Sequence, residues 1–170
     1  GKVFNFPYVI TRSANNFGTG QDKEKFIPKT IKALLEDKPI VLYGSGKQMR
    51  QWVSTAEHVD MILKLQEAIP SGKVIGEVFN IAGVQITNID LVYLMAECLK
   101  LEKGNIKFDQ TFDRPGHDLA YAVSDEKLSE VIKGPQKSNL QVRLPMYSQE
   151  QFKEDFSNAV YWYDITSYSK

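Results

Sequence analysis

Residues 8–18 have the sequence YVITRSANNFG, in which an apolar stretch runs directly into a polar one with two adjacent amides. We expect a strand at Tyr8–Arg12, then a loop, then a helix over residues 27–35, where apolar side chains recur at helical spacing. In open α/β sheets ligands bind at the carboxyl ends of such strands, which favours Asn15 and Asn16 as ligand contacts. Asn is also a common turn former, so this stretch alone supports a turn equally well.

The rest of the chain continues to alternate strands and helices, which predicts an α/β fold. Strands at 40–43 and 49–53 flank Gly44-Ser45-Gly46, and we expect them to pair as a hairpin. A Ser54–Glu57 capping box predicts a helix. We expect that helix to bury Val59, Ile62, Leu63 and Ile69. Further strands are expected at 78–81 and 106–108, a polar loop at 109–117, and helices at 87–99, 124–132 and 148–163.

Composition and charge narrow the classes of function. The chain has 170 residues, of which 42% are hydrophobic, and its 21 basic residues equal its 21 acidic ones. This excludes a disordered chain and gives no basic excess for nucleic acid or anionic membranes. A single cysteine, Cys98, excludes an internal disulfide, and no apolar run approaches ~20 residues. We expect a cytoplasmic protein with neither a nucleic-acid nor a membrane partner.

Most motifs for catalysis are missing or incomplete. Gly44-Ser45-Gly46-Lys47 fails as a phosphate-binding loop, because that motif needs Gly at Val41 and Ser or Thr at Gln48. The two histidines, His58 and His117, lack neighbours at metal-ligand spacing, so we expect no metal. Cys98 lies on an apolar helical face and is interpreted as an inert thiol. We assign no catalytic residue.

Two basic positions are harder to explain structurally. Arg50 lies in an expected strand, and an arginine fork suits phosphate groups, although a surface charge on an edge strand would look the same. The turn 113–118 (DRPGHD) concentrates an arginine, a histidine and two acids, and a charge-paired loop is the alternative. Arg50, Arg114 and Lys25 together would form a local anion site despite the zero net charge.

Three stretches taken in order carry a resemblance: TRSANNFG (11–18), YGSGKQMRQW (43–52) and DRPGHDLAYA (113–122). Between them lie EKFIP (24–28), EHV (57–59), GEVFNIAG (76–83) and TNIDLV (87–92). In this order and spacing they resemble the carboxyl-terminal half of the NDP-sugar 4,6-dehydratases, and in particular the dTDP-glucose 4,6-dehydratase family. These are lyases of deoxysugar biosynthesis in the extended short-chain dehydrogenase/reductase (extended SDR) superfamily. The similarity covers residues 8–133.

The resemblance implies a role for each matched residue. Asn15 would contact the sugar nucleotide, and Asn16 the nicotinamide side of NAD. Arg50 and Asn88 would hold the diphosphate, an anion suited to charge-assisted hydrogen bonds. Other substrate contacts are implied for Lys25 and Phe26 in the pocket, Val41, Leu42 and Tyr43 along the base, and Asp113, Arg114, Pro115, Gly116 and His117 over the nucleotide.

The resemblance places the chemistry of this family outside the matched half. The dehydratases oxidise the sugar C4 by hydride transfer to NAD, eliminate water across C5–C6 and return the hydride to C6. The NAD fingerprint, the Tyr-x-x-x-Lys pair and the acid/base Asp-Glu pair lie upstream of that half, and we expect this chain to lack them. We therefore expect residues 1–170 to be a substrate-binding lobe that is not catalytic alone and does not bind NAD alone. The start on Gly1 fits a cut from a longer protein.

The expected fold class is thus the carboxyl-terminal substrate lobe of an extended SDR, with strands at 8–12 and 78–81 that would belong to a missing Rossmann sheet. The expected partners are a nucleotide-diphosphate sugar, and either the missing Rossmann domain or further copies of the chain. The family usually has Asp at Gln51 and Pro at Thr19, so the substrate stays open. Two alternatives also stay open: the matching half of an NDP-sugar epimerase or decarboxylase, and a non-catalytic sugar-nucleotide-binding module.

Overall fold

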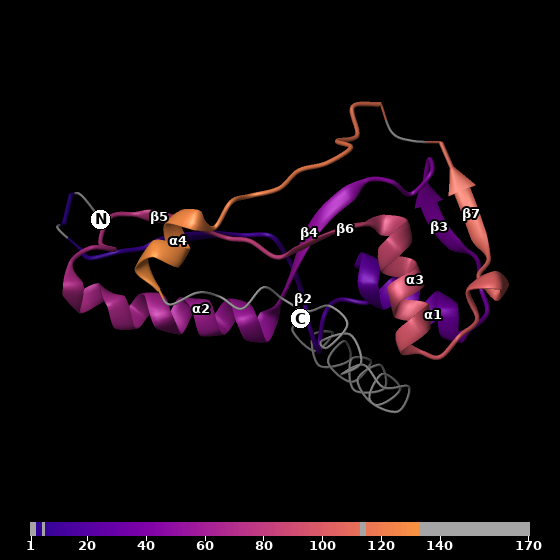
Figure 1. Cartoon of the computed structure of the whole chain (residues 1–170), viewed down its shortest axis with the longest axis horizontal. Coiled ribbons are helices and arrows are strands. Elements are labelled where there is room, and N and C mark those ends of the chain that lie inside the picture. Colours follow the sequence, from indigo (N-terminus) through magenta and orange to yellow (C-terminus); the bar gives the residue numbers. More distant parts are fainter. Residues whose placement is uncertain (1–2, 5, 113–114, 133–170) are drawn as a thin grey trace, which may run out of the picture.

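The computed structural model describes residues 3–4, 6–112 and 115–132. Figure 1 shows an elongated molecule with two groups of elements at opposite ends, between which β4 and β6 extend. The strands are β1 (Ile10–Ser13), β2 (Asn15–Phe17), β3 (Ile40–Tyr43), β4 (Met49–Ser54), β5 (Val78–Ile81), β6 (Val84–Thr87) and β7 (Phe108–Thr111). The helices are α1 (Phe26–Leu35), α2 (Thr55–Ala68), α3 (Asn88–Cys98) and α4 (Glu126–Val131), with short 3-10 turns at Ile69–Ser71 and Lys103–Asn105.

The strands form three small sheets, and three of their four pairings are parallel. β1 pairs with β5 and β3 pairs with β7, both in parallel, while β4 pairs in parallel with β2 and antiparallel with β6. Parallel strands need long crossover connections, which here contain the helices. The predicted mixed α/β class is confirmed.

The predicted hairpin of residues 40–43 and 49–53 is wrong. β3 and β4 are consecutive in sequence but belong to different sheets. Gly44 and Gly46 both have positive φ, and five residues separate the strands. Because β3 pairs with β7 and β4 with β2 and β6, the turn redirects the chain from one sheet to the next.

Two apolar clusters form the core. The first joins α1, α3 and the side of β4 that carries Trp52, with Ile27, Trp52 and Leu91 all buried. The second joins α2, α4 and β5, with Met61, Phe79 and Leu128 buried. β4 contributes to both clusters, since Trp52 faces the first and Val53 the second, as the alternation of side chains along a strand requires.

The predicted buried stripe of α2 is wrong. Val59, Ile62 and Leu63 are 53%, 41% and 51% exposed, whereas Met61 and Leu65 are buried. Apolar residues occupy two faces of this helix, and periodicity does not tell which of the two meets the sheet. The predicted faces of α1 and α3 are buried, by contrast, through Ile31 and Met95 among others.

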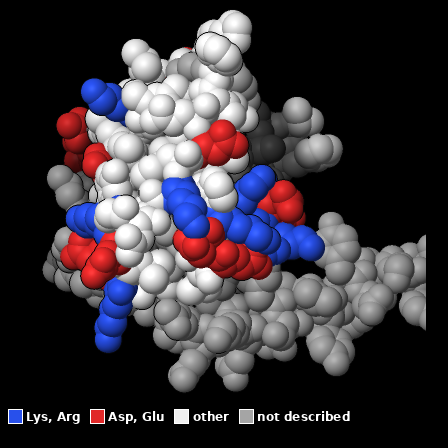
Figure 2. All heavy atoms as spheres, turned by 90° about the vertical axis from the view of Figure 1, so that its right-hand side faces the viewer, with Lys and Arg blue, Asp and Glu red and all other residues white. Residues whose placement is uncertain are grey.

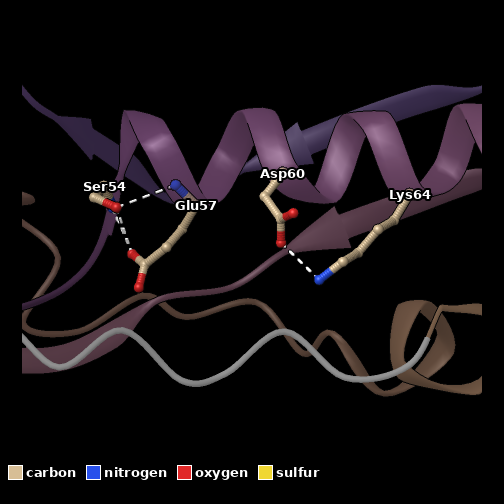
Figure 3. Close-up of polar contacts among 4 residues, drawn as sticks. All are labelled: Ser54, Glu57, Asp60 and Lys64. Atoms are coloured by element: carbon tan, nitrogen blue, oxygen red, sulfur yellow. Dashed lines mark hydrogen bonds and ion pairs between the residues drawn. The ribbon is translucent and has the colours of Figure 1, made fainter.

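The predicted capping box at the start of α2 is confirmed (Figure 3). The Glu57 backbone N–H donates to Ser54 Oγ over 3.2 Å, and the Ser54 backbone N–H donates to Glu57 Oε2, also over 3.2 Å. One turn further on, Lys64 donates to Asp60 Oδ2 over 2.6 Å. The box satisfies helix N–H groups that have no partner within the helix.

Several predicted boundaries shift and two strands were not predicted. β2 lies in a region expected to be a loop, and β6 follows β5 after a single turn at Ala82–Gly83. A side chain at Gly83 would collide with the carbonyl of Trp52, so β6 reaches β4 only with glycine there. β7 runs to Thr111, inside the expected polar loop. The predicted helix over 148–163 lies outside the described residues.

Candidate functional site

One cavity of about 600 Å³ gathers most of the predicted binding residues. Such a volume is ordinary for a small-molecule site. Ten predicted residues line it: Asn15, Phe26, Val41, Leu42, Tyr43, Arg50, Asn88, Pro115, Gly116 and His117. Three residues that the sequence reasoning missed complete the lining: Trp52, Asp118 and Tyr121.

The wall of the cavity comes from β4, β2 and β3. Arg50 and Trp52 are two residues apart in β4 and therefore point to the same side of the strand. Trp52 pairs in register with Asn15 of β2, and its ring stacks on Phe26 with centroids 6.2 Å apart. The spacing from Arg50 to Trp52 is the signal that could have identified Trp52 from sequence.

Arg50 is the central polar group, although only 9% of it is exposed. Nη1 donates to the Met49 carbonyl over 2.7 Å and to the Asp118 carbonyl over 3.1 Å. Nη2 donates to the same Asp118 carbonyl over 3.1 Å and to His117 Nε2 over 3.0 Å. Because a guanidinium has donors only, His117 Nε2 is the acceptor in this contact.

Residues 117–123 form a strap along the edge of β4, and aromatic rings of this strap close the cavity. Tyr121 stacks on Arg50 with the guanidinium carbon 4.4 Å from the ring centroid. The Tyr121 hydroxyl donates to Asn15 Oδ1 over 3.4 Å. His117 meets Tyr43 edge to face at 5.9 Å. The strap thus connects β2, β3 and β4 across one side of the cavity.

The amino end of α3 contributes Asn88, but its backbone donors are already used. Asn88 N donates to Gln48 O and Ile89 N to Gly46 O, each over 3.0 Å. Asp90 N donates to Thr87 Oγ1. The helix end therefore offers its Asn88 side chain to the cavity, and its first N–H groups hold the turn before β4.

Among the described residues, two predicted site residues, Lys25 and Asn16, do not line the cavity. Lys25 is exposed at the N-cap of α1 and does not line it. Asn16 points elsewhere: its Nδ2 donates to Ser13 Oγ over 2.7 Å, and its Oδ1 lies 2.7 Å from His58 Nδ1. Asp113 and Arg114 lie outside the described residues. The predicted cluster of Lys25, Arg50 and Arg114 therefore reduces, among the described residues that line the cavity, to Arg50.

The Asn16–His58 contact is a half-buried polar pair between β2 and α2. Nδ1 of His58 donates to the amide oxygen, and Nε2 is buried without a hydrogen-bond partner among the described residues. Burial lowers the pKa of His58 from its ordinary value, because the charged imidazolium loses its hydration. The neutral form of His58 is thus favoured, and its ring lies in hydrogen-bond contact with the Asn16 amide.

The expected absence of a Tyr-x-x-x-Lys spacing is wrong, because Tyr43 and Lys47 have it. Side chains four residues apart share a face in a helix. Here Tyr43 ends β3 and Lys47 follows the glycine turn, so the helical geometry is absent. An Asp-Glu dipeptide also occurs, at Asp125–Glu126, but it begins α4 and does not line the cavity.

The remaining reactive groups offer no second site. Cys98 is half-buried, and burial together with Glu97 raises the pKa of its thiol. No group of three or more possible metal ligands occurs among the described residues. A second cavity, of about 720 Å³, lies between the ends of α1 and α3, and its lining includes Asp37 and Lys107, which pair with each other.

Charges on the α1, α3 and β7 end are mixed. Figure 2 shows Lys and Arg side chains beside Asp and Glu side chains on that face. Glu36 pairs with Lys38 at 2.7 Å, which lowers the pKa of that carboxyl. Such a face has no single-sign field to attract a polyanion. Within the described ranges, no helix is long and apolar enough to cross a membrane.

Comparisons with known proteins agree with this geometry. A model of the NAD dependent epimerase/dehydratase family matches residues 1–82. A dTDP-glucose 4,6-dehydratase of Haemophilus influenzae is 31% identical over 178 aligned residues, which cover 99% of this chain and 48% of that protein. The chain spans about half the length of the curated relatives that it matches.

Solved structures show the same partial match. The dTDP-glucose 4,6-dehydratase of Bacillus anthracis in complex with NAD has a TM-score of 0.72 and 28% identity, covering 90% of this chain and 47% of that one. The Streptomyces venezuelae dTDP-glucose 4,6-dehydratase with NAD and TYD bound has a TM-score of 0.70 and 28% identity over 90% and 46% of the two chains. UDP-glucose 4-epimerase of Thermotoga maritima, with a TM-score of 0.77 but 22% identity, shares the fold.

Proposed function

We propose, from the premise that this chain is related to the NAD dependent epimerase/dehydratase family through residues 1–82, that its cavity binds the nucleoside diphosphate part of a sugar nucleotide. The chain would serve as the substrate-binding part of an NAD-dependent NDP-hexose 4,6-dehydratase with the expected cytoplasmic location. The epimerase structures support the shared fold, and no contact in the cavity favours an epimerase over a dehydratase.

The observation that carries the proposal is the convergence of residues from five distant segments on one cavity. Asn15, Val41, Arg50, Asn88 and His117 come from β2, β3, β4, α3 and the strap, and all line it. Arginine is the side chain best suited to a diphosphate, since its fork donates two parallel bonds to phosphate oxygens. Val41 and Tyr43 are exposed along β3 and offer apolar surface to a base.

The hydrogen bonds that Arg50 already makes determine how an anion would bind. Nη1 and Nη2 already donate to the Asp118 carbonyl and His117 Nε2. A diphosphate would therefore share or replace these acceptors. A phosphate oxygen carries more charge than a carbonyl or an imidazole nitrogen, so the exchange favours the anion.

The described residues do not by themselves fit NAD. Asn16 is the residue expected to contact the nicotinamide, and both ends of its amide are engaged by Ser13 and His58. The residues of this chain instead bind and orient the sugar nucleotide, with Arg50 on the diphosphate and Asn15 toward the sugar.

Calorimetric titration with dTDP and UDP, and with their glucose esters, tests the proposal. Arg50→Ala should weaken the binding of all four by about 1.5–3 kcal/mol, the value of a hydrogen bond to a charged group. Arg12→Ala is the matched control, since Arg12 is exposed on β1 and does not line the cavity. Unchanged affinity in Arg50→Ala would remove Arg50 as the diphosphate ligand, and no binding by the unmodified chain would remove the proposal.

A separate measurement addresses catalysis. The 170-residue chain incubated with dTDP-glucose and NAD should release no 4-keto-6-deoxy product, because the family's hydride and proton-transfer residues have no counterparts in its cavity. Product release by this chain would contradict the assignment of a binding role alone.

A further inference from the structure

Three consecutive residues of β4 hold the strap, residues 117–123. Met49 N donates to the Leu119 carbonyl over 2.7 Å, and Arg50 donates twice to the Asp118 carbonyl. Gln51 makes the third attachment, at Val123. Of these three residues, only Arg50 lines the cavity. Gln51 therefore contacts the strap but does not line the cavity.

The Gln51 amide binds Val123 through both of its ends. Nε2 donates to the Val123 carbonyl over 3.2 Å, and Oε1 accepts from the Val123 backbone N–H over 2.9 Å. Gln51 is 8% exposed and Val123 is half-buried, so both bonds are partly shielded from water. A carboxamide alone among the common polar groups of this size offers a donor and an acceptor in one plane, whereas a carboxylate only accepts.

These attachments fix the part of the strap that faces the cavity. Tyr121 lies between Leu119 and Val123, which are bound to Met49 and Gln51. Its ring stacks on Arg50 and its hydroxyl reaches Asn15. With both flanking residues held, Tyr121 keeps one position relative to Arg50.

We propose that Gln51 is a positioning residue, which clamps Val123 so that Tyr121 and Arg50 present a preformed site to a nucleoside diphosphate. The proposal rests on the proposed function and adds to it the residue that keeps the site assembled. Preformed sites bind more tightly because less ordering is required when the ligand arrives. A buried glutamine that only satisfies the core would instead affect stability and leave ligand binding unchanged.

The clamp itself can be tested without a ligand, by hydrogen exchange at the Val123 amide. Gln51→Met keeps the length and burial of the side chain but removes both bonds, so exchange of Val123 should accelerate. Gln85→Met is the matched control, because Gln85 is the register partner of Gln51 on β6 and its amide donates to Met49 Sδ instead of to the strap backbone. Gln51→Asn, which is one methylene too short to reach, is a second variant should the methionine fold poorly.

Binding of dTDP tests the positioning. Gln51→Met should weaken dTDP about fivefold, as expected for the loss of about 1 kcal/mol of net hydrogen bonding. If Gln51 acts through Tyr121, the double variant Gln51→Met/Tyr121→Ala should bind no more weakly than Tyr121→Ala alone. A purely structural role would give unchanged affinity in Gln51→Met, or two effects that add.

The outcomes separate this proposal from the proposed function. Unchanged Val123 exchange in Gln51→Met overturns the clamp, and unchanged or additive affinity effects overturn the positioning. If the unmodified chain binds no nucleoside diphosphate, the proposed function fails and the positioning fails with it. In that case the exchange measurement still decides whether Gln51 clamps the strap.

Discussion

The two ends of the molecule differ in how fully they bury the apolar side chains of their helices. At the end formed by α1 and α3, apolar side chains such as Ile27 and Leu91 are fully buried. At the end formed by α2, β1 and β5, Leu63 is 51% exposed and Ile10 45% exposed. Both ends have helices beside parallel strands, and both have a buried cluster, but α2 and β1 leave further apolar side chains of their own exposed.

The contrast shows what a helical repeat encodes. In α1 and α3 the apolar residues occupy one face, and that face meets β3, β4 and β6 in the first cluster. In α2 they occupy two faces, one of which packs through Met61 and Leu65 on the second cluster. Parallel sheets are ordinarily covered on both sides, and the two-stranded β1–β5 sheet leaves Ile10 open.

Truncating one leucine at each end gives the largest expected difference. Leu91→Ala should lower the free energy of unfolding by about 2.7–5 kcal/mol, since the lost methyl groups leave a cavity in the first cluster. Leu63→Ala should change it by less than about 0.5 kcal/mol, because half of that side chain already meets water. Urea denaturation measures both. A loss in Leu63→Ala comparable to that in Leu91→Ala would show that the outer face of α2 is covered in solution.

The helix caps provide a second, smaller comparison. Ser54 is buried and takes part in a reciprocal box with Glu57, whereas Thr87 caps α3 at a half-buried position. Ser54→Ala should cost about 1–2 kcal/mol and Thr87→Ala about 0.5–1 kcal/mol, as judged from thermal or urea unfolding. Equal losses would mean that burial and the Glu57 bond add nothing to the cap.

The smallest expected effect is the change in the free energy of unfolding on acidification, which acts through His58 in α2. Burial holds the pKa of His58 below 6.5, its ordinary value, so the unfolded chain takes up a proton first as the pH falls. The stability contributed by neutral His58 is present above pH 6.5 and declines below it. Unfolding curves at pH 7 and pH 5 should differ less in His58→Gln than in the unmodified protein. An equal pH dependence in His58→Gln and in the unmodified protein would contradict this origin.

The sequence predicted local structure well wherever one segment was sufficient. The Ser54–Glu57 box, the burial of Ile31 and Met95, and β5 follow from residues close together in the chain. The resemblance to NDP-sugar dehydratases is confirmed by relatives and solved structures. The pairing of β3 with β7 instead of β4 could not be predicted, because it depends on strands 65 or more residues away.

The candidate site divides in the same way. Arg50 and Asn15 were identified by residue type and by position at strand ends. The bonds between Gln51 and Val123 escaped prediction, since a glutamine in a strand carries no signal for a backbone partner 72 residues later. The resemblance assigned Asn16 to the nicotinamide side of NAD, whereas in this structure successive residues of β2 point to opposite sides and Asn16 pairs with His58.

The glycine turn before β4 determines which residues of that strand face the cavity. Met49, Arg50 and Gln51 each bind a different residue of the strap, and alternate residues of β4 face different clusters. One residue inserted between Gly46 and Met49 would shift the register of β4 by one position. The guanidinium of Arg50 would then turn away from the cavity, and Val53 would turn toward it. The length of this loop therefore determines which residues of β4 reach the cavity, and a single added amino acid would disturb the site without replacing any residue that lines it.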